Sequence, residues 1–210
     1  MSGANSPRGQ VTAVVVAYDS AAILPSCLDA IERNGIGVVV VDNASLDGSA
    51  EIAARSGAHV IRNSQNQGYG RANNQGVAAA TTPFVLIINP DVMLASNAVS
   101  ELLAAATRYP DGVIFAPRIT EPDGRIFFQA RSLLAPRHLN RAKKDNVTPS
   151  GDVCAPFLSG ACLMIRREAF MAGGGFDPNI FLFYEDDDLC RRLGQMGGLI
   201  HVDSARAVHQ

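Results

Sequence analysis

The sequence predicts an α/β fold with a mostly parallel central sheet that is flanked by helices. Two observations support this prediction. Runs of β-branched and other apolar residues alternate along the chain with segments whose apolar residues recur at helical spacing. Several of these runs lead directly into carboxylates, as at Asp42 and Asp91. With 210 residues and 47% hydrophobic content, the chain is long enough to bury one sizeable core.

The first part of the chain alternates strands and helices. Strands are predicted at 11–17, 38–41 and 84–88, and helices at 23–31, at 45–56 and in an alanine-rich segment that ends near 80. The strand at 84–88 is apolar throughout, so it should be buried on both faces of the sheet. Pro90 cannot donate to a sheet ladder, so this strand should end before Pro90 and leave Asp91 beyond its carboxyl edge.

The second part of the chain continues the alternation with one interruption. We predict helices at 97–106, at 166–172 and from 185 onward, and strands at 113–116, 157–165 and 199–202. Residues 132–154 are rich in proline, basic and polar residues, which predicts a mobile loop. Residues 1–10 are expected to be a flexible tail, and residues 11–210 a single domain.

Charge and hydropathy argue against a nucleic-acid partner and against a membrane-spanning segment. The formal net charge is −2, and only Lys143-Lys144 approaches a basic cluster, so no nucleic-acid partner is expected. No apolar run approaches the roughly 20 residues that cross a bilayer, and the first ten residues lack the apolar core of a signal peptide. A cytoplasmic location is therefore expected.

Three aspartates follow predicted strands. Asp19, Asp42 and Asp91 should share one rim, because the carboxyl ends of parallel strands meet at the same edge of a sheet. Their negative charges would repel unless a cation lay between them, and a divalent ion such as Mg²⁺ that also holds a diphosphate is the simplest candidate. The alternative is that each aspartate is only a turn or helix-cap residue.

An acidic run, Glu185-Asp186-Asp187-Asp188, opens the last predicted helix. A helix N-terminus stabilises negative charge, which could account for one or two of these residues but not for four. Helical geometry gives the four carboxylates separate environments, and their mutual repulsion should raise some pKa values toward the range of a general base. His209 could bind a metal or a phosphate, although a lone histidine is more often structural.

Two common nucleotide-binding motifs are missing from the sequence. Gly68 and Gly70 begin a dinucleotide fingerprint, but Asn73 stands where the third small residue is needed. A sugar nucleotidyltransferase usually has a basic, glycine-rich loop after its first strand, and residues 18–22 (YDSAA) have neither property. The sequence therefore gives little support to a nicotinamide-dinucleotide enzyme or to a sugar nucleotidyltransferase.

Seven motifs occur together in one order along nearly the whole chain. They are VVVAYDS (14–20), VVVDNASLDGS (39–49), NQGYGRANNQG (66–76), INPDV (88–92), FLSGACLMIRREAF (157–170), GGFDPNIFLFYEDDDLCRRL (174–193) and AVH (207–209). In this order they resemble the family 2 glycosyltransferases with the GT-A fold, the fold of nucleotide-diphospho-sugar transferases, and in particular bacterial rhamnosyltransferase-like members.

The resemblance implies a role for each matched site residue. Residues 11–92 would be the nucleotide-binding half and 93–210 the acceptor and catalytic half. Asp186 would be the general base, with Glu185 and Asp187 as alternatives. Asn89 and Asp91, in place of the Asp-x-Asp signature, would bind the metal and diphosphate together with His209. The nucleotide contacts would be Tyr18, Asp19, Asp42, Gly70, Arg71 and Asn74.

The resemblance also implies an inverting transferase that depends on Mg²⁺ or Mn²⁺. Its donor would be a dTDP- or UDP-sugar, such as a rhamnose donor, and its acceptor a hydroxyl group of a glycan or lipid-linked glycan. Peripheral association with the inner face of the membrane would then be expected. Many family members continue beyond the position of His209, so this chain would be a short form or a truncated one. The alternatives are a non-catalytic nucleotide-sugar-binding module and a sugar nucleotidyltransferase.

Overall fold

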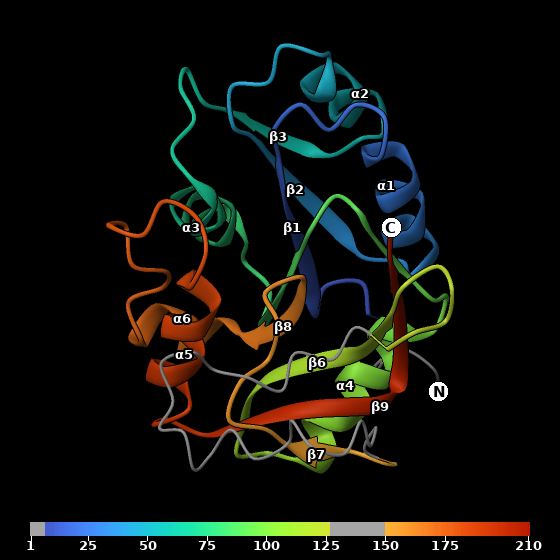
Figure 1. Ribbon diagram of the computed structural model, residues 1–210, viewed down its shortest axis with the longest axis vertical. Helices are drawn as coiled ribbons and strands as arrows, with labels where there is room; N and C mark the ends of the chain where they lie inside the picture. The colour runs from blue at the N-terminus through green and yellow to red at the C-terminus, as the bar shows by residue number, and fades with distance from the viewer. Residues whose placement is uncertain (1–6, 127–149) are drawn as a thin grey trace.

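The computed structural model describes residues 7–126 and 150–210, and within these ranges nine strands form one mixed sheet (Figure 1). The strands are β1 (Val11–Ala17), β2 (Gly37–Asp42), β3 (His59–Arg62), β4 (Phe84–Ile88), β5 (Val92–Leu94), β6 (Gly112–Thr120), β7 (Val153–Cys154), β8 (Cys162–Arg166) and β9 (Gly198–His209). Their order is β3-β2-β1-β4-β8-β6-β9-β5, with β7 also paired to β9. The predicted α/β class is confirmed.

Four neighbouring strands, β3-β2-β1-β4, form a parallel part of the sheet. β1 pairs in parallel with β2 and β4, and β2 pairs in parallel with β3. All five residues of β4 are buried, as expected for a strand covered on both faces. The carboxyl ends of these strands meet at one edge, where β1 leads into Tyr18, β2 into Asn43 and β4 into Asn89.

Among the remaining strands, β5 and β7 were not predicted, β6 is longer than predicted, and the largest differences are at β8 and β9. β8 begins only at Cys162 and runs antiparallel to β4 and β6, so residues 157–161 form a loop at the sheet edge instead of a strand. β9 continues beyond the predicted 199–202 as far as His209. Residues 203–205 bulge out of its parallel pairing with β6, and the pairing resumes at Arg206. The polar Asp203 and Ser204 in this bulge conceal the continuation in the sequence.

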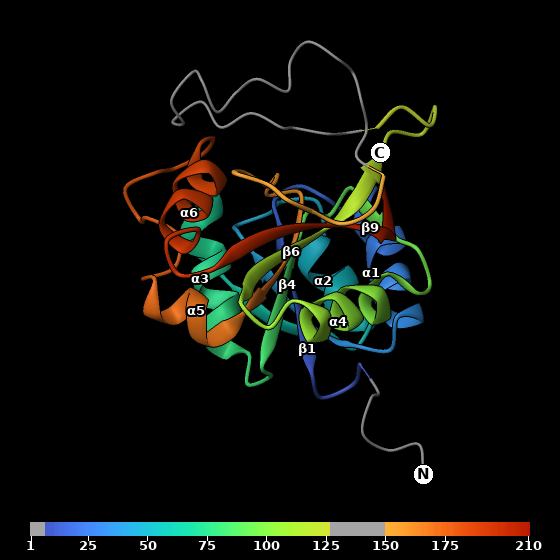
Figure 2. The same cartoon turned by 90° about the horizontal axis from the view of Figure 1, so that it is seen from below.

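Six helices cover the two faces of the sheet within the described ranges. They are α1 (Leu24–Arg33), α2 (Ser49–Arg55), α3 (Tyr69–Ala79), α4 (Ala98–Arg108), α5 (Arg167–Ala172) and α6 (Glu185–Leu193). Figure 2 shows α1, α2 and α4 on one side of the sheet and α3, α5 and α6 on the other. Each face of the sheet has its own hydrophobic core, and alternate residues of β1 point into one or the other. Val15 packs in the core with α1 and α4, and Val14 packs in the core with α3, α5 and α6.

Two expectations about mobile segments fall mainly outside the described residues. The tail predicted at 1–10 is described only from residue 7, where Gln10 N–H donates to Pro7 O at 3.0 Å and closes a turn. Of the loop predicted at 132–154, residues 132–149 lie outside the described ranges, and Val153–Cys154 form β7. None of the helices in the described part of the chain is long and apolar enough to cross a membrane.

Candidate active site

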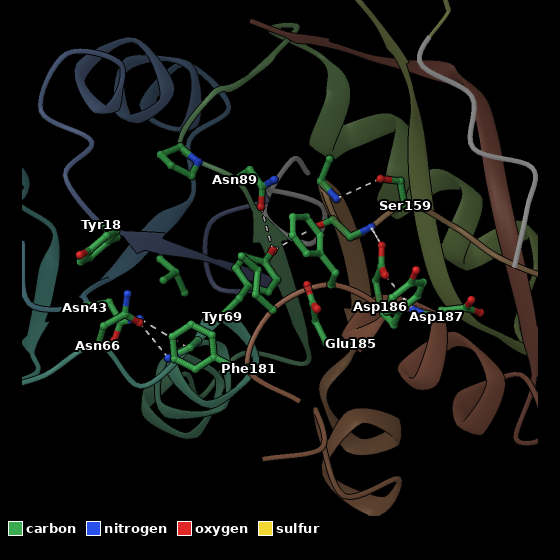
Figure 3. Close-up of a pocket in the computed structure, with 18 of the residues that line it drawn as sticks. Tyr18, Asn43, Asn66, Tyr69, Asn89, Ser159, Phe181, Glu185, Asp186 and Asp187 are labelled. Atoms are coloured by element: carbon green, nitrogen blue, oxygen red, sulfur yellow. Dashed lines mark hydrogen bonds between the residues drawn. The ribbon is translucent and has the colours of Figure 1, made fainter. Parts of the chain in front are cut away.

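A pocket of about 630 Å³ opens at the carboxyl edge of β1 and β4. Figure 3 shows that both halves of the chain supply its walls. The first half contributes Tyr18, Asn43, Asn66, Tyr69 and Asn89, and the second half contributes Ser159, Phe181, Glu185, Asp186, Asp187 and His209. The pocket therefore brings together the predicted base, Asn89 and His209 of the predicted metal rim, and one predicted nucleotide contact, Tyr18, whereas Asp91 does not belong to its lining.

A network of amides forms the end of the pocket next to β2. The buried Asn43 donates from Nδ2 to Asn66 Oδ1 at 2.8 Å. Its own Oδ1 accepts from Gln67 N–H at 2.9 Å and from Asn63 Nδ2 at 3.1 Å. These bonds fix an amide-rich loop onto the end of β2, so the polar groups at this end of the pocket are held in place.

The predicted nucleotide contacts at this end differ in their environments. Tyr18 lines the pocket and is half-exposed. Asp42 ends β2 as a buried side chain, and its Oδ1 accepts no hydrogen bond from any described residue. Asp19 has a left-handed backbone (φ +46°), and its Oδ1 accepts from Leu46 N–H at 2.8 Å. Of the three, only Tyr18 lines the pocket, and the contact of Asp19 and Asp42 with a nucleotide stays a prediction.

The other three predicted nucleotide contacts lie on α3 and bond to the segment that leads into α6. Asn74 holds both backbone groups of Phe176: its Nδ2 donates to the carbonyl oxygen at 2.8 Å and its Oδ1 accepts from N–H at 2.9 Å. Arg71 Nε donates to Pro178 O at 2.6 Å. A Cβ atom on Gly70 would lie 2.9 Å from Phe176 Cβ, so close packing requires glycine there. None of these three lines the pocket, and their contact with a nucleotide stays a prediction.

The predicted metal rim consists of the turn after β4 and the end of β9. His209 pairs with Val92 in the sheet, and Gln210 N–H donates to Asp91 O at 2.8 Å. His209 Nε2 lies 3.6 Å from Asp91 Oδ2, while Asp91 Oδ1 is buried and accepts no hydrogen bond from the described residues. His209 is thus held by strand pairing opposite Asp91, although it is next to the last residue of the chain.

The donor atoms of this rim fit a hard or borderline divalent cation. The amide and carboxylate oxygens of Asn89 and Asp91 suit Mg²⁺ or Mn²⁺, and the imidazole of His209 adds a nitrogen that Mn²⁺ accepts. The buried, unpartnered Asp91 Oδ1 is an observation that such an ion would explain. Within residues 7–126 and 150–210, however, no three His, Cys, Asp or Glu side chains cluster as a metal site. Substrate oxygens would therefore have to complete the coordination.

Asp186 lies at the opposite side of the pocket, in the first turn of α6. Its Oδ2 accepts from Gly160 N–H at 2.8 Å and its Oδ1 accepts from Asp187 N–H at 2.9 Å. Burial raises the pKa of the Asp186 carboxyl group, although these two hydrogen bonds oppose the change. A carboxylate with a raised pKa that is held at the wall of a pocket is suited to accept a proton.

The other acidic residues of α6 do have separate environments, as predicted. Glu185 and Asp187 are buried, whereas Asp188 turns away and pairs with Arg192 at 2.6 Å and Arg191 at 3.3 Å. Against the opposing effect of burial, these arginines hold the pKa of Asp188 below its usual range. The expected cause of the raised values was mutual repulsion, but for Glu185 and Asp186 burial is the larger cause.

Glu185 is a buried carboxyl group at the pocket wall whose Oε2 has no hydrogen-bond partner among the described residues. Burial raises its pKa, so the folded state binds its proton more tightly than the unfolded state does. Stability is therefore lost as pH rises from the ordinary glutamate range, about 4.3, through the raised pKa. We predict that Glu185→Gln raises the Tm at pH values above that window and has no such effect below it. Equal Tm differences at all pH values would contradict this prediction.

Two residues that support the site were not singled out from the sequence. Tyr69, the first residue of α3, places its hydroxyl group 2.9 Å from Asn89 Oδ1 and 3.1 Å from Gly160 O. Gly160 lies so close to Asp186 that a Cβ atom would be 2.9 Å from Asp186 Cβ. Both belong to motifs that carry the family resemblance, but their contacts join residues that are far apart in sequence.

The sheet order and the pocket at its carboxyl edge define the GT-A fold of nucleotide-sugar transferases. The chain belongs to Glycosyl transferase family 2, whose model matches residues 12–174. It is 32% identical over 204 residues to the N-acetylglucosaminyl-diphospho-decaprenol L-rhamnosyltransferase of Mycobacterium tuberculosis, an alignment that covers 83% of this chain and 66% of that protein. It is also 27% identical over 171 residues to the low-salt glycan biosynthesis hexosyltransferase Agl10 of Haloferax volcanii, with 73% and 52% covered.

Solved structures agree on the fold. Staphylococcus aureus TarS superposes with a TM-score of 0.74 at 16% identity. The superposition covers 96% of this chain and 60% of the TarS chain. The mannosyltransferase PcManGT of Pyrobaculum calidifontis, solved with GDP-Man and Mn²⁺, gives a TM-score of 0.71 at 20% identity, with 99% and 59% covered. The chain thus spans about two thirds or less of these relatives' lengths.

Proposed function

We propose that this protein is an inverting, metal-assisted glycosyltransferase. It would move a hexose from a nucleotide-diphosphate donor to a hydroxyl group of an acceptor. The single observation that supports this best is that one pocket is lined by Asn89 and His209 on one side and by Asp186 on the other. The residues that would bind the leaving group and the residue that would act as the base thus line the same cavity, as a single displacement at a sugar carbon requires.

Each end of the pocket has a distinct task in this proposal. Asn89, Asp91 and His209 would hold Mg²⁺ or Mn²⁺, which supplies positive charge to the diphosphate leaving group. Asp186 would remove the proton from the acceptor hydroxyl while that oxygen attacks the anomeric carbon from the face opposite the diphosphate. One displacement of this kind inverts the anomeric centre. The nucleoside would lie toward Tyr18 and Asp42, next to the amide network around Asn43.

The relatives suggest the substrates. The name of the mycobacterial relative specifies transfer of L-rhamnose to a lipid-linked diphosphate sugar, and the mannosyltransferase was solved with GDP-Man and Mn²⁺. TarS was solved with UDP-GlcNAc. We propose the dTDP- or UDP-sugar expected from the sequence as donor, with rhamnose as the first sugar to test, and a glycan or lipid-linked glycan as acceptor. A lipid-linked acceptor would bring the protein to a membrane surface.

A thermal-shift panel tests this function. We predict that nucleotide sugars and divalent metal stabilise the protein together, because a ligand that binds the native state raises its apparent stability. Mg²⁺ or Mn²⁺ alone should shift the Tm little, since the described residues provide too few ligands to hold a free ion tightly. dTDP-rhamnose, UDP-glucose and GDP-mannose are tested with and without each metal. A large shift with metal alone would contradict the proposed division of ligands between protein and donor.

The alternative is a non-catalytic nucleotide-sugar-binding module. Slow hydrolysis of the bound donor distinguishes the two, because a transferase without acceptor passes the sugar to water whereas a binding module releases no nucleoside diphosphate. Release that requires both the metal and Asp186 would exclude the binding module.

A further inference from the structure

Tyr69 occupies a junction between the two sides of the pocket. Figure 3 shows its side chain among the residues that line the pocket, with its hydroxyl group directed toward Asn89. Its single O–H proton is shared between two acceptors, Asn89 Oδ1 at 2.9 Å and Gly160 O at 3.1 Å, and its backbone N–H donates to Phe181 O at 3.0 Å. Tyr69 therefore touches the turn after β4, the loop before β8 and the segment that leads into α6.

The contact with Gly160 leads on to Asp186. Gly160 accepts the Tyr69 contact at its carbonyl oxygen and donates its N–H to Asp186 Oδ2 at 2.8 Å. A continuous path through the Tyr69 side chain and the Gly160 peptide thus runs from Asn89 to Asp186. Backbone pairing supports the same junction, since Asn89 N–H donates to Ala161 O at 2.9 Å.

We propose that Tyr69 is a positioning residue whose hydroxyl group fixes Asn89, on the donor side, relative to the peptide that holds Asp186. The inference rests on the proposed function, because it assigns Asn89 and Asp186 to opposite ends of one reaction. Small errors in the separation of reacting groups lower rates steeply, so a bond that spans the pocket floor preserves the rate by holding the two ends in register.

Two properties of Tyr69 suit it to this role. A phenol is protonated at physiological pH, so the hydroxyl group has a proton to donate. The ring is held independently of the hydroxyl, because it packs edge-on against Phe176 with centroids 6.0 Å apart. Tyr69→Phe therefore removes the link and leaves the packing of α3 in place.

The test follows both ends of the link by NMR and needs no substrate. Wild type, Tyr69→Phe and the control Tyr109→Phe are labelled at aspartate ¹³Cγ and at asparagine ¹⁵Nδ2, with Asp186→Asn and Asn89→Ala used for assignment. In Tyr69→Phe we expect the Asn89 amide signals to move and the Asp186 titration to shift to higher pH. The second change follows because a loosened Gly160 N–H stabilises the ionised carboxylate less.

The control removes a hydroxyl group of the same kind at the end of α4, away from the pocket, and should change neither signal. A change at only one end of the path, or at neither, overturns the proposal. A residue that only stabilised the fold would lower the Tm without shifting the Asp186 titration. Because neither readout depends on turnover, the result is independent of whether the proposed transferase activity is found.

Discussion

Asp186→Asn is expected to lower the rate of donor hydrolysis and sugar transfer by about 10²–10⁴-fold, the usual contribution of a positioned general base. The amide has nearly the shape of the carboxylate and can still accept from Gly160 N–H, although its Nδ2 cannot accept from Asp187 N–H, so the pocket should keep its form with the loss of that one bond. Donor binding, measured by the thermal shift with metal and nucleotide sugar, should be almost unchanged. The effect should therefore fall on kcat and not on donor KM.

The acidic run supplies matched controls for this prediction. Asp188→Asn alters the same helix, but its carboxylate pairs with Arg191 and Arg192 and lies outside the pocket lining, so turnover should remain close to wild type. Glu185→Gln and Asp187→Asn test the two alternative bases. Loss of turnover in either of these with normal activity in Asp186→Asn would move the base to that residue.

The pH dependence adds a second readout. The proposed base must be ionised, and burial raises the pKa of Asp186, so the rate should increase with pH through this raised value. This acid limb should be absent from whatever activity Asp186→Asn retains. An unchanged acid limb in the variant would show that another group titrates there.

Local sequence signals predicted most of the fold and one side of the site. Apolar runs located β1, β2 and β4, and Pro90 correctly marked the end of β4. Because the order of parallel strands fixes which loops share an edge, the strand pattern was enough to place the ends of β1, β2 and β4 together, whereas the rim of Asp19, Asp42 and Asp91 stays a prediction, since none of the three lines the pocket. The general-base assignment came from the family resemblance together with the acidic run.

Contacts between distant segments could not be predicted in this way. Tyr69 meets a carbonyl 91 positions away, and Arg71 and Asn74 bond to backbone groups 107 and 102 positions away. No periodicity or local motif encodes such pairings, since they depend on how α3 packs against the loops of the second half. The same limit explains why burial was underestimated as the cause of the raised Glu185 and Asp186 pKa values.

Gly160→Ala is expected to be the most damaging change outside the carboxylates. The added Cβ would lie 2.9 Å from Asp186 Cβ and 3.2 Å from Asp186 Oδ2, so the base must move away or the loop before β8 must shift. A displacement of about 1 Å can cost about 10²-fold in rate, and overpacking of this kind costs about 1–3 kcal/mol of stability. The loss in kcat should therefore far exceed any loss in the fraction of folded protein at the assay temperature.

Gly37→Ala at the start of β2 is the matched control for this change, because a Cβ there meets no atom within 4 Å. Rates are compared at a temperature where circular dichroism shows each variant to be fully folded, so that loss of stability and loss of alignment are separated. Gly160→Ala should then retain metal-dependent donor binding while hydrolysis is lost, because the added methyl group faces Asp186 and not the rim at Asp91. Equal rates in the two alanine variants would show that Asp186 need not be held against Gly160 for the reaction, and would weaken its assignment as the base.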